Sequence, residues 1–299
     1  MEATGMTRIA HLSDSHMLDP RPSRTRSGWS MRVRFLSFGR PLDADHRHRK
    51  LSRSLEAARR TGAQHIVLSG DLTEVGNPGE YEALAEVLHD SGIAPERLTL
   101  VPGNHDLYSA PDAWKWALQG PLAAFARTSA SEPGKLVDVG GAAILPLDVA
   151  FHQPVTRSAG YINANSIEAL EARASDPAHS RKPLVVVQHH PPFVRKTKAW
   201  DWIDGLIGAK RMMDLLEAFR HLFVLHGHLH YVVDRALSCG VSRIFGATAV
   251  VDDKDAPRVR VYEVSDGLLR RADLSPQRAA AEVIPLFASP GTLPHRRFA

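Results

Sequence analysis

Five short apolar runs are spaced along the chain, and each has the composition of a buried strand. They lie at residues 8–13, 65–68, 98–101, 183–188 and 221–225. Runs of this length, bounded by turn residues, are typical of strands buried on both faces of a sheet. Between them, apolar residues recur at helical spacing within 46–62, 78–92, 111–127, 165–174 and 209–220. The pattern therefore predicts strands and helices in alternation.

Antiparallel pairing is predicted at two further places. Gly140-Gly141 separates the apolar segments 136–139 and 142–147, which is the pattern of a β-hairpin. Apolar and polar residues alternate at 231–237, 243–247 and 259–264. This pattern predicts an antiparallel meander that closes the fold. β-α-β units combined with antiparallel strands indicate a layered α/β domain with more than one sheet.

Residues 17–45 interrupt the alternation and form a predicted insertion. Prolines and glycines lie towards both ends, while the middle, 29–38, alternates bulky apolar residues with arginines. Such a segment suits a flap, a membrane-surface element or a dimer contact. We find no internal repeat and no second boundary, so we expect one domain over 1–274. The prolines of 275–299 predict an extended or partly disordered tail.

Composition narrows the classes of protein and of site. Hydrophobic residues make up 43% of the chain, which is enough for a sizeable core. No apolar stretch reaches the length of a membrane span and the N-terminus lacks a signal pattern, so we expect a cytoplasmic protein. Cys239 is the single cysteine, which excludes an intramolecular disulfide and a thiolate metal cage. The 16 histidines instead indicate nitrogen and oxygen metal ligands.

The net charge of +4 is unevenly distributed. Between Arg21 and Arg60 there are twelve Lys or Arg residues against Asp43, Asp45 and Glu56, which gives +9 and leaves −5 for the rest. A basic segment of this kind is either a solvated face or a surface that attracts phosphates, anionic lipid or nucleic acid. No recognisable module for duplex nucleic acid accompanies it.

Side chains that can bind metals follow all five apolar runs. In chain order they are Asp14, His16, Asp71, Asn104, His105, Asp106, His189, His228 and His230. In open α/β sheets, ligands bind at the carboxyl ends of the strands, where such residues would meet. Carboxylate, amide and imidazole together suit Mn, Fe or Zn better than Ca, which prefers more oxygen.

The order of these blocks resembles that of the calcineurin-like binuclear metallophosphoesterase family. The blocks are Asp-x-His at 14–16, Gly-Asp at 70–71, Gly-Asn-His-Asp at 103–106, His-His-Pro-Pro at 189–192 and Gly-His-x-His at 227–230. Within that family, the sequence resembles bacterial class III cyclic nucleotide phosphodiesterases and glycerophosphodiesterases. The resemblance implies an α-β-β-α sandwich in which two mixed sheets are flanked by helices and the metal site lies at the carboxyl ends of the strands.

The resemblance also implies roles for the residues. Asp71 would bridge two divalent ions, Mn, Fe or Zn, and a hydroxide between the ions would attack phosphorus. His105 would stabilise a phosphate oxygen or assist the leaving group, and Asp106 would orient His105. The remaining ligands would be Asp14, His16 and His230 for one ion and Asn104, His189 and His228 for the other.

Several substrates and partners are compatible with this site. A phosphodiester, with cyclic nucleotides among the candidates, is the first choice. A lipid-linked or nucleotide-linked pyrophosphate or diester at a membrane surface is an alternative, with residues 21–40 as the membrane contact, and homo-oligomers are also possible. Arg195, Lys196 and Trp200 are candidate substrate contacts. In a different class, a metal-free scaffold could keep the loops without catalysis.

Overall fold

The computed structural model describes residues 6–21, 31–193, 197–238, 240–254 and 256–272. The predicted tail, 275–299, lies outside these residues, as do residues 22–30 of the predicted insertion. The strands are β1 (Thr7–Leu12), β2 (His65–Ser69), β3 (Leu98–Val101), β4 (Val137–Asp138), β5 (Ala143–Pro146), β6 (Gly160–Tyr161), β7 (Leu184–Val187), β8 (Leu206–Ile207), β9 (Leu222–His226), β10 (Val233–Ala236), β11 (Ser242–Gly246), β12 (Arg260–Ser265) and β13 (Leu268–Arg271). The α-helices are α1 (Met31–Leu36), α2 (Ala44–Arg60), α3 (Pro78–Asp90), α4 (Ala113–Gln119), α5 (Ala164–Ser175), α6 (Lys198–Asp204) and α7 (Ala209–Ala218). Single 3₁₀ turns are η1 (Pro95–Arg97), η2 (His105–Leu107), η3 (Ala123–Phe125) and η4 (Val250–Asp252).

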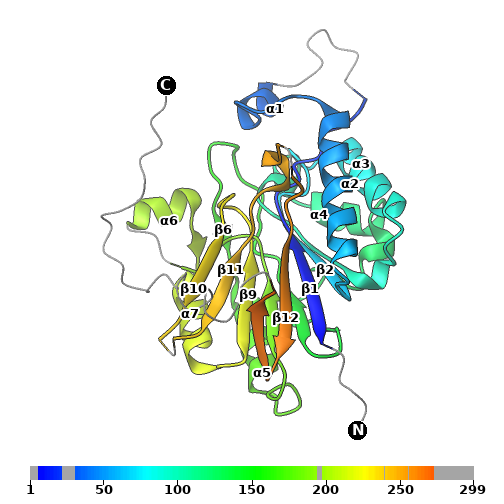
Figure 1. Cartoon of the computed structure of the whole chain (residues 1–299). Coiled ribbons are helices and arrows are strands. Elements are labelled where there is room, and N and C mark those ends of the chain that lie inside the picture. Colours follow the sequence, from blue (N-terminus) through cyan, green and yellow to red (C-terminus); the bar gives the residue numbers. More distant parts are fainter. Residues whose placement is uncertain (1–5, 22–30, 194–196, 239, 255, 273–299) are drawn as a thin grey trace.

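Two mixed sheets form the centre of the molecule (Figure 1). The first has the order β13-β12-β1-β2-β3, with β1, β2 and β3 parallel and β12 antiparallel to β1. The second has the order β10-β11-β9-β7-β5-β4, with β11, β9, β7 and β5 parallel. A small parallel pair, β6-β8, lies apart from both sheets.

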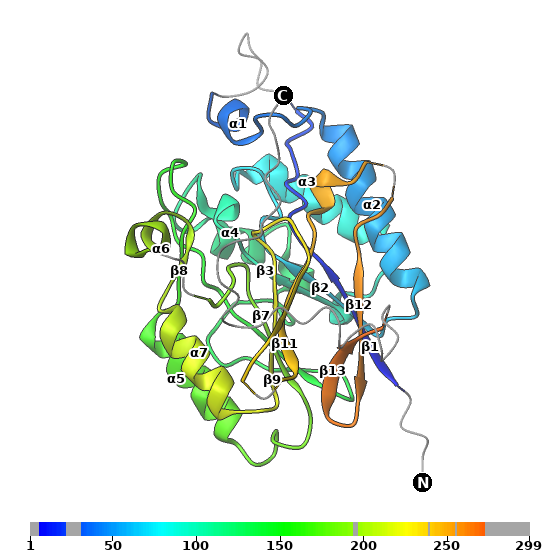
Figure 2. The same ribbon diagram turned by 60° about the vertical axis from the view of Figure 1, so that its left-hand side comes forward.

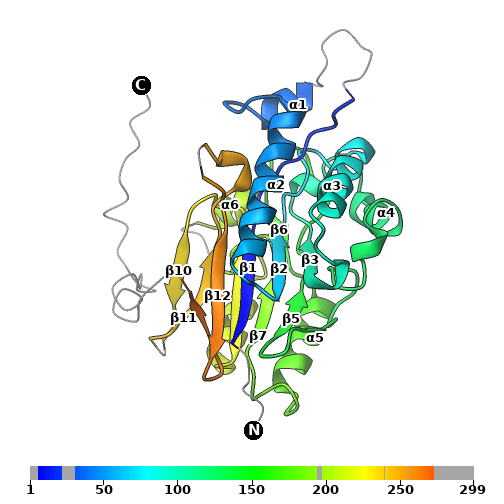
Figure 3. The same ribbon diagram turned by 45° about the vertical axis from the view of Figure 1, so that its right-hand side comes forward.

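Three apolar clusters define the layers. Ile9, Val67 and Val101 of the first sheet pack with Val185 and Phe223 of the second, so this cluster fills the space between the sheets. A second cluster packs α2, α3 and α4 on the outer face of the first sheet, and a third packs α5 and α7 on the second (Figures 2 and 3). This arrangement is the predicted α-β-β-α sandwich.

The prediction of a closing meander was wrong. β10 and β11 pair antiparallel as expected, but β12 crosses to the other sheet and pairs with β1. Alternating residues predict a strand that is buried on one side, but they do not indicate which sheet it joins. The predicted helix over 111–127 is also shorter, because α4 ends at Gln119 and only the turn η3 follows.

The described part of the insertion packs beside the loops that follow β2 and β3. Val33 of α1 is buried in a small cluster with Leu18, Val75 and Tyr108. The Arg32 guanidinium donates a hydrogen bond to the Tyr108 carbonyl at 3.0 Å, which ties α1 to the loop after β3. Figures 1 and 3 show α1 over the end of the sheets that lies opposite the start of β1. Within the described residues, the search for a helix long and apolar enough to cross a membrane finds none.

Candidate metal centre

Loops that leave the carboxyl ends of five strands bring the predicted ligands together. They follow β1, β2 and β3 in the first sheet and β7 and β9 in the second. The Asp14 and His16 amides donate to the carbonyls of Gly70 and Asp71 at 3.0 Å, which ties the loop after β1 to the loop after β2. The His228 amide donates to Asp14 Oδ1 at 3.3 Å and so connects the loop after β9. The site therefore lies across the seam between the sheets.

The backbone is strained at most of the predicted ligands. Within the described residues, six residues other than glycine have a positive φ, and the one outside the site is Asp266 in an Asp-Gly turn. The other five are predicted ligands: Asp14 (56°), His16 (48°), Asp71 (49°), His228 (68°) and His230 (58°). Such conformations cost of order 1–3 kcal/mol each and persist where the surrounding structure imposes them. Their concentration here indicates a functional site.

Two glycines of the sequence blocks lie so close to neighbouring side chains that no other residue fits at their positions. A Cβ atom on Gly70 would lie 2.5 Å from Nδ1 of His189, and Gly70 has a φ of +93°. A Cβ atom on Gly103 would lie 2.2 Å from Oδ1 of Asp71. Real Cβ atoms do not approach other atoms this closely, so only glycine allows the loops to converge on Asp71.

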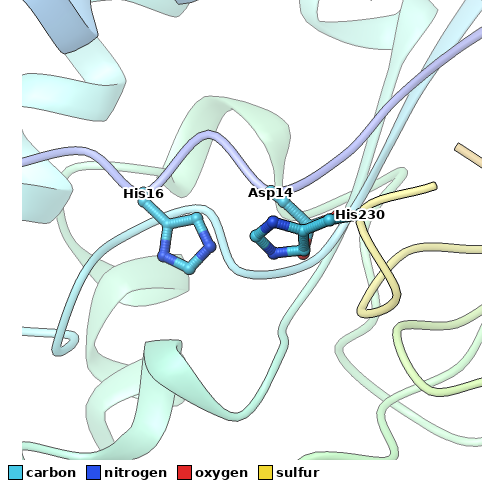
Figure 4. Close-up of side chains that lie close together, drawn as sticks. All are labelled: Asp14, His16 and His230. Carbon is cyan, nitrogen blue, oxygen red and sulfur yellow. The ribbon is translucent and has the colours of Figure 1, made fainter. Parts of the chain in front are cut away.

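Three overlapping groups of side chains have ligand atoms within 4.8 Å of one another. They are Asp14, His16 and His230; Asp14, Asp71 and His189; and His16, Asp71 and His105. Figure 4 shows the first group, in which His230 lies against Asp14 with His16 beside them. The shortest separations are 3.1 Å between His189 Nε2 and Asp71 Oδ2 and 3.3 Å between His230 Nε2 and Asp14 Oδ1.

Several ligand atoms in the site are buried without a hydrogen-bond partner among the described residues. They are Asp14 Oδ2, both ring nitrogens of His16 and Asn104 Oδ1. The Asn104 amide nitrogen donates to the Tyr108 hydroxyl at 2.9 Å, which turns Oδ1 away from Tyr108. Leaving such atoms unpaired is costly, and a divalent cation would satisfy all of them. The donor set therefore fits a metal centre.

The electrostatics of the site balance buried carboxylates against imidazoles. Burial opposes ionisation of Asp71, but the imidazoles of His189 and His105 lower its pKa well below the usual value. Burial also opposes protonation of His189 and His230, yet Asp71 raises the pKa of His189 to about 9 and Asp14 raises the pKa of His230 to about 10. Divalent cations would replace these protons as the positive charge beside the carboxylates.

The neighbouring residues His105 and Asp106 have different surroundings. His105 lies beside Asp71 with 13% of its side chain exposed, and its Nδ1 is 2.7 Å from the Glu74 carbonyl. The Asp106 carboxylate accepts from the amides of Leu72, Thr73 and Gly103 at 3.1, 2.8 and 2.8 Å. These hydrogen bonds hold the loops after β2 and β3 together, and the orientation of the His105 ring by Asp106 stays a prediction.

Sequence reasoning missed three carboxylates that contact the predicted ligands. Asp204 Oδ1 lies 2.8 Å from His228 Nε2, and Asp252 Oδ2 lies 2.8 Å from His230 Nδ1. Buried Glu74 lies 3.7 Å from His16 Nδ1 and also pairs with Arg47 of α2 at 3.3 Å. Of the three, only Glu74 lies in a loop that follows one of the five apolar runs, so the pattern gave no signal for Asp204 or Asp252.

The candidate substrate contacts remain predictions. Arg195 and Lys196 lie outside the described residues. Trp200 lies on α6 with 57% of its surface exposed, and α6 ends at Asp204, the residue that contacts His228.

The comparison with protein families covers most of the described chain. The family described as calcineurin-like phosphoesterase matches residues 7–232. The chain belongs to this family. The matched region begins with β1 and ends just after His230, so it contains every predicted metal ligand.

Two relatives align over part of the chain. The glycerophosphodiester phosphodiesterase GpdQ of Enterobacter lignolyticus (strain SCF1) is 30% identical over 166 residues. These residues are 55% of this chain and 55% of the relative, so the chain matches about half of the length of that protein. A probable cyclic nucleotide phosphodiesterase of Synechococcus sp. is 26% identical over 208 residues, or 65% of this chain and 68% of the relative.

Solved structures share the architecture at low identity. A dimetal phosphatase from Danio rerio has a TM-score of 0.61 and 12% identity, and the alignment covers 87% of this chain and 93% of that one. The purple acid phosphatase PPD1 from yellow lupin (Lupinus luteus) seeds has a TM-score of 0.51 and 10% identity, with 88% and 50% covered. These likenesses confirm the predicted fold class.

Proposed function

We propose that this protein is a metal-dependent phosphoester hydrolase that acts on phosphodiesters, with cyclic nucleotides among the candidate substrates. The observation that carries the proposal is the buried set of unpartnered carboxylate, amide and imidazole atoms around Asp71. Membership of the calcineurin-like phosphoesterase family supports the reaction. The names of the two relatives, which both describe phosphodiesterases, support the choice of a diester.

The proposed centre holds two divalent ions, Mn, Fe or Zn, with Asp71 as the shared ligand. The other proposed ligands are Asp14, His16 and His230 for one ion and Asn104, His189 and His228 for the other. Two such ions would supply an activated water and would neutralise charge on the phosphoryl group. Asp71 is suited to sharing because Gly70 lets His189 approach closely and Gly103 lets the loop after β3 pack directly against the Asp71 carboxylate.

His105 is the proposed proton donor. A carbonyl oxygen only accepts, so the 2.7 Å contact with Glu74 places a proton on Nδ1 of His105. Nε2 then lies on the side of Asp71, 3.9 Å from Oδ2. A proton on Nε2 would stabilise a phosphoryl oxygen or assist the leaving alkoxide.

The test of the proposed function is Mn²⁺-dependent hydrolysis of bis-p-nitrophenyl phosphate. We expect Asp71→Asn to lower kcat by at least about 10³-fold, because both proposed ions lose their shared ligand. Asp138→Asn is the matched control, since that carboxylate is 71% exposed and pairs with Lys182 on the surface. A wild-type protein inactive with Mn²⁺, Fe²⁺ and Zn²⁺ would rule out the proposal. The metal-free scaffold predicts well under one bound ion per chain in protein purified without chelator.

A substrate panel tests the choice of diester. It compares 3′,5′- and 2′,3′-cyclic nucleotides, glycerophosphodiesters, phosphomonoesters and nucleotide-linked pyrophosphates at matched concentrations. We expect diesters to have the highest kcat/KM values. A monoester or a pyrophosphate with a kcat/KM at least about tenfold above every diester would contradict the choice.

A second candidate is a phosphoester substrate at an anionic membrane surface. Met31, Phe35 and Phe38, on and just after α1, are 82%, 59% and 91% exposed, and arginines alternate with the apolar residues of this helix. Exposed apolar and basic side chains on one short helix favour an interfacial contact. We expect Phe35→Ser/Phe38→Ser to abolish sedimentation with phosphatidylglycerol liposomes. Trp116→Ser, a 41% exposed aromatic on α4, is the control, and equal binding by all three proteins would exclude this contact.

A further inference from the structure

Arg40 extends from the insertion to a predicted metal ligand. Its Nε donates to Asp252 Oδ1 at 3.2 Å, and its Nη2 lies 3.0 Å from Nδ1 of His230. The side chain is 24% exposed. His230 Nε2 in turn lies 3.3 Å from Asp14 Oδ1, so the guanidinium is separated from the carboxylates of the centre by a single imidazole ring.

The close contact between Arg40 and His230 does not provide a hydrogen-bond acceptor for the guanidinium N–H groups. Asp252 Oδ2 lies 2.8 Å from the same Nδ1 atom of His230, and a carboxylate there requires a proton on Nδ1. This tautomer leaves the Nε2 lone pair for a metal, and a carboxylate partner of this kind is typical of metal-binding histidines. Since Nδ1 then donates to Asp252, it has no lone pair for Arg40. The outer N–H groups of Arg40 are therefore available to another acceptor.

A cleft of about 820 Å³ begins beside these residues. Arg40, His230 and Asp252 line this cleft, and so do Lys254 and Arg258. Basic side chains outnumber carboxylates along the wall, which favours a negatively charged occupant. The cleft thus gives a small anionic molecule a route to the predicted metal ligands.

We propose that Arg40 is a catalytic residue that binds the oxygens of the substrate phosphoryl group, in the cleft beside His230. The inference rests on the proposed phosphoester hydrolysis and adds a residue from outside the five sequence blocks. A planar guanidinium presents paired N–H donors that match phosphate oxygens. Asp252 positions Arg40 through Nε and His230 through Nδ1, and so sets the guanidinium beside the metal ligands.

The experiment compares wild type with Arg40→Gln and Arg40→Lys, all loaded with Mn²⁺. We expect Arg40→Gln to lower kcat/KM for bis-p-nitrophenyl phosphate about 10- to 100-fold, and Arg40→Lys to lower it less, because lysine keeps the charge without the paired donors. Titration calorimetry with inorganic phosphate should show at least about tenfold weaker binding by Arg40→Gln. The bound metal per chain should stay unchanged. Arg59→Gln is the matched control, because Arg59 pairs with Glu56 at 2.7 Å on the surface of α2 and does not line the cleft.

Two results would overturn the inference. One is a kcat/KM and a phosphate affinity within about twofold of wild type, since a group that binds the phosphoryl oxygens cannot be removed at so little cost. The other is a parallel loss of bound metal, which would mean that Arg40 acts only by supporting His230. Failure of the proposed function would give a different result from failure of this inference. The wild-type protein itself would then be inactive, while the phosphate titration would still compare wild type with Arg40→Gln.

Discussion

Asp106 connects the loop after β2 to the loop after β3 through a single carboxylate. It accepts hydrogen bonds from the amides of Leu72, Thr73 and Gly103, and also from the Thr73 hydroxyl at 2.7 Å. Burial and, to a lesser extent, the charge of Asp71 raise the pKa of Asp106 to about 6. The ionised carboxylate is therefore disfavoured by its surroundings, yet its hydrogen bonds fix the geometry of the loops. Asp106, the residue that follows His105, therefore supports the loop that carries Asp71.

Replacing Asp106 should destabilise the protein. Asp106→Asn removes the negative charge and one of the two acceptor oxygens, so we expect the free energy of unfolding to fall by about 2–4 kcal/mol. Urea unfolding followed by circular dichroism measures the change, with Asp138→Asn as the surface control. Unchanged stability combined with a shifted pH profile of kcat would instead support the role predicted from the sequence, in which Asp106 orients His105.

His65 gives a pH dependence that is independent of the metal centre. It begins β2, is buried, and its Nε2 lies 2.8 Å from the Thr99 hydroxyl. Burial, aided by Arg97, lowers the pKa of His65 from 6.5 to about 4. Because the pKa of His65 is lower in the folded protein, the unfolded chain takes up the proton at a higher pH than the folded protein does. Stability from the neutral ring is therefore complete above pH 6.5 and is lost as the pH falls from 6.5 to 4.

The corresponding prediction concerns His65→Gln, which keeps a polar group beside Thr99 but does not titrate. Between pH 7 and pH 4.5, wild type should lose about 2–3 kcal/mol of unfolding free energy relative to the variant, at about 1.4 kcal/mol per pKa unit. Urea titrations of both proteins at each pH, in the same buffer and metal concentration, give the difference. Parallel curves would show that His65 does not titrate differently in the folded protein.

At the scale of elements, the start of α3 fixes the end of the loop that carries Asp71. Asn77 accepts from the Glu80 amide at 3.0 Å, and the Glu80 carboxylate accepts from the amides of Val75 and Gly76 at 2.8 and 3.0 Å. This capping box closes the loop onto the helix. Asn163 caps α5, because its side-chain oxygen accepts a hydrogen bond from the Ser166 amide. However, α5 lies on the outer face of the second sheet.

The two caps form a matched pair of substitutions. Asn77→Ala and Asn163→Ala should each lower the free energy of unfolding by about 1 kcal/mol, because each leaves one helical amide without its acceptor. Only Asn77→Ala should also weaken Mn²⁺ binding, since its loop holds Asp71. Thermal unfolding and metal titration of both variants test this. Equal metal affinities would show that the loop geometry does not depend on the cap.

The five strands that lead to the site and the helices between them were predictable from the sequence, because burial produces a regular spacing of apolar residues in each. The same strand endings indicated the ligand positions, since side chains after parallel strands meet at one edge. Asp204, Asp252 and Arg40 were not predictable, because contacts between segments far apart in the chain leave no local pattern. The crossing of β12 to the first sheet was missed for the same reason.

At the scale of the whole molecule, the candidate centre connects the two sheets. Asp14, Asp71 and Asn104 come from loops of the first sheet, and His189 and His230 come from loops of the second. Between the sheets lies an apolar cluster, whereas this end of the interface is filled by charged and polar groups. Metal ions bound here would therefore act as crosslinks between the layers as well as in catalysis.

Metal removal should accordingly destabilise the whole fold. A cation that binds only the folded state adds about 2.7 kcal/mol per site at 100 times its Kd, which for a chain of this size corresponds to a Tm increase of about 4 °C per site. We expect EDTA to lower the Tm by that amount and excess Mn²⁺ to restore it. Asp71→Asn is the control, because it lacks the shared ligand and its Tm should respond far less to either treatment. The same Tm with EDTA and with Mn²⁺ in the wild-type protein would contradict a metal link between the sheets.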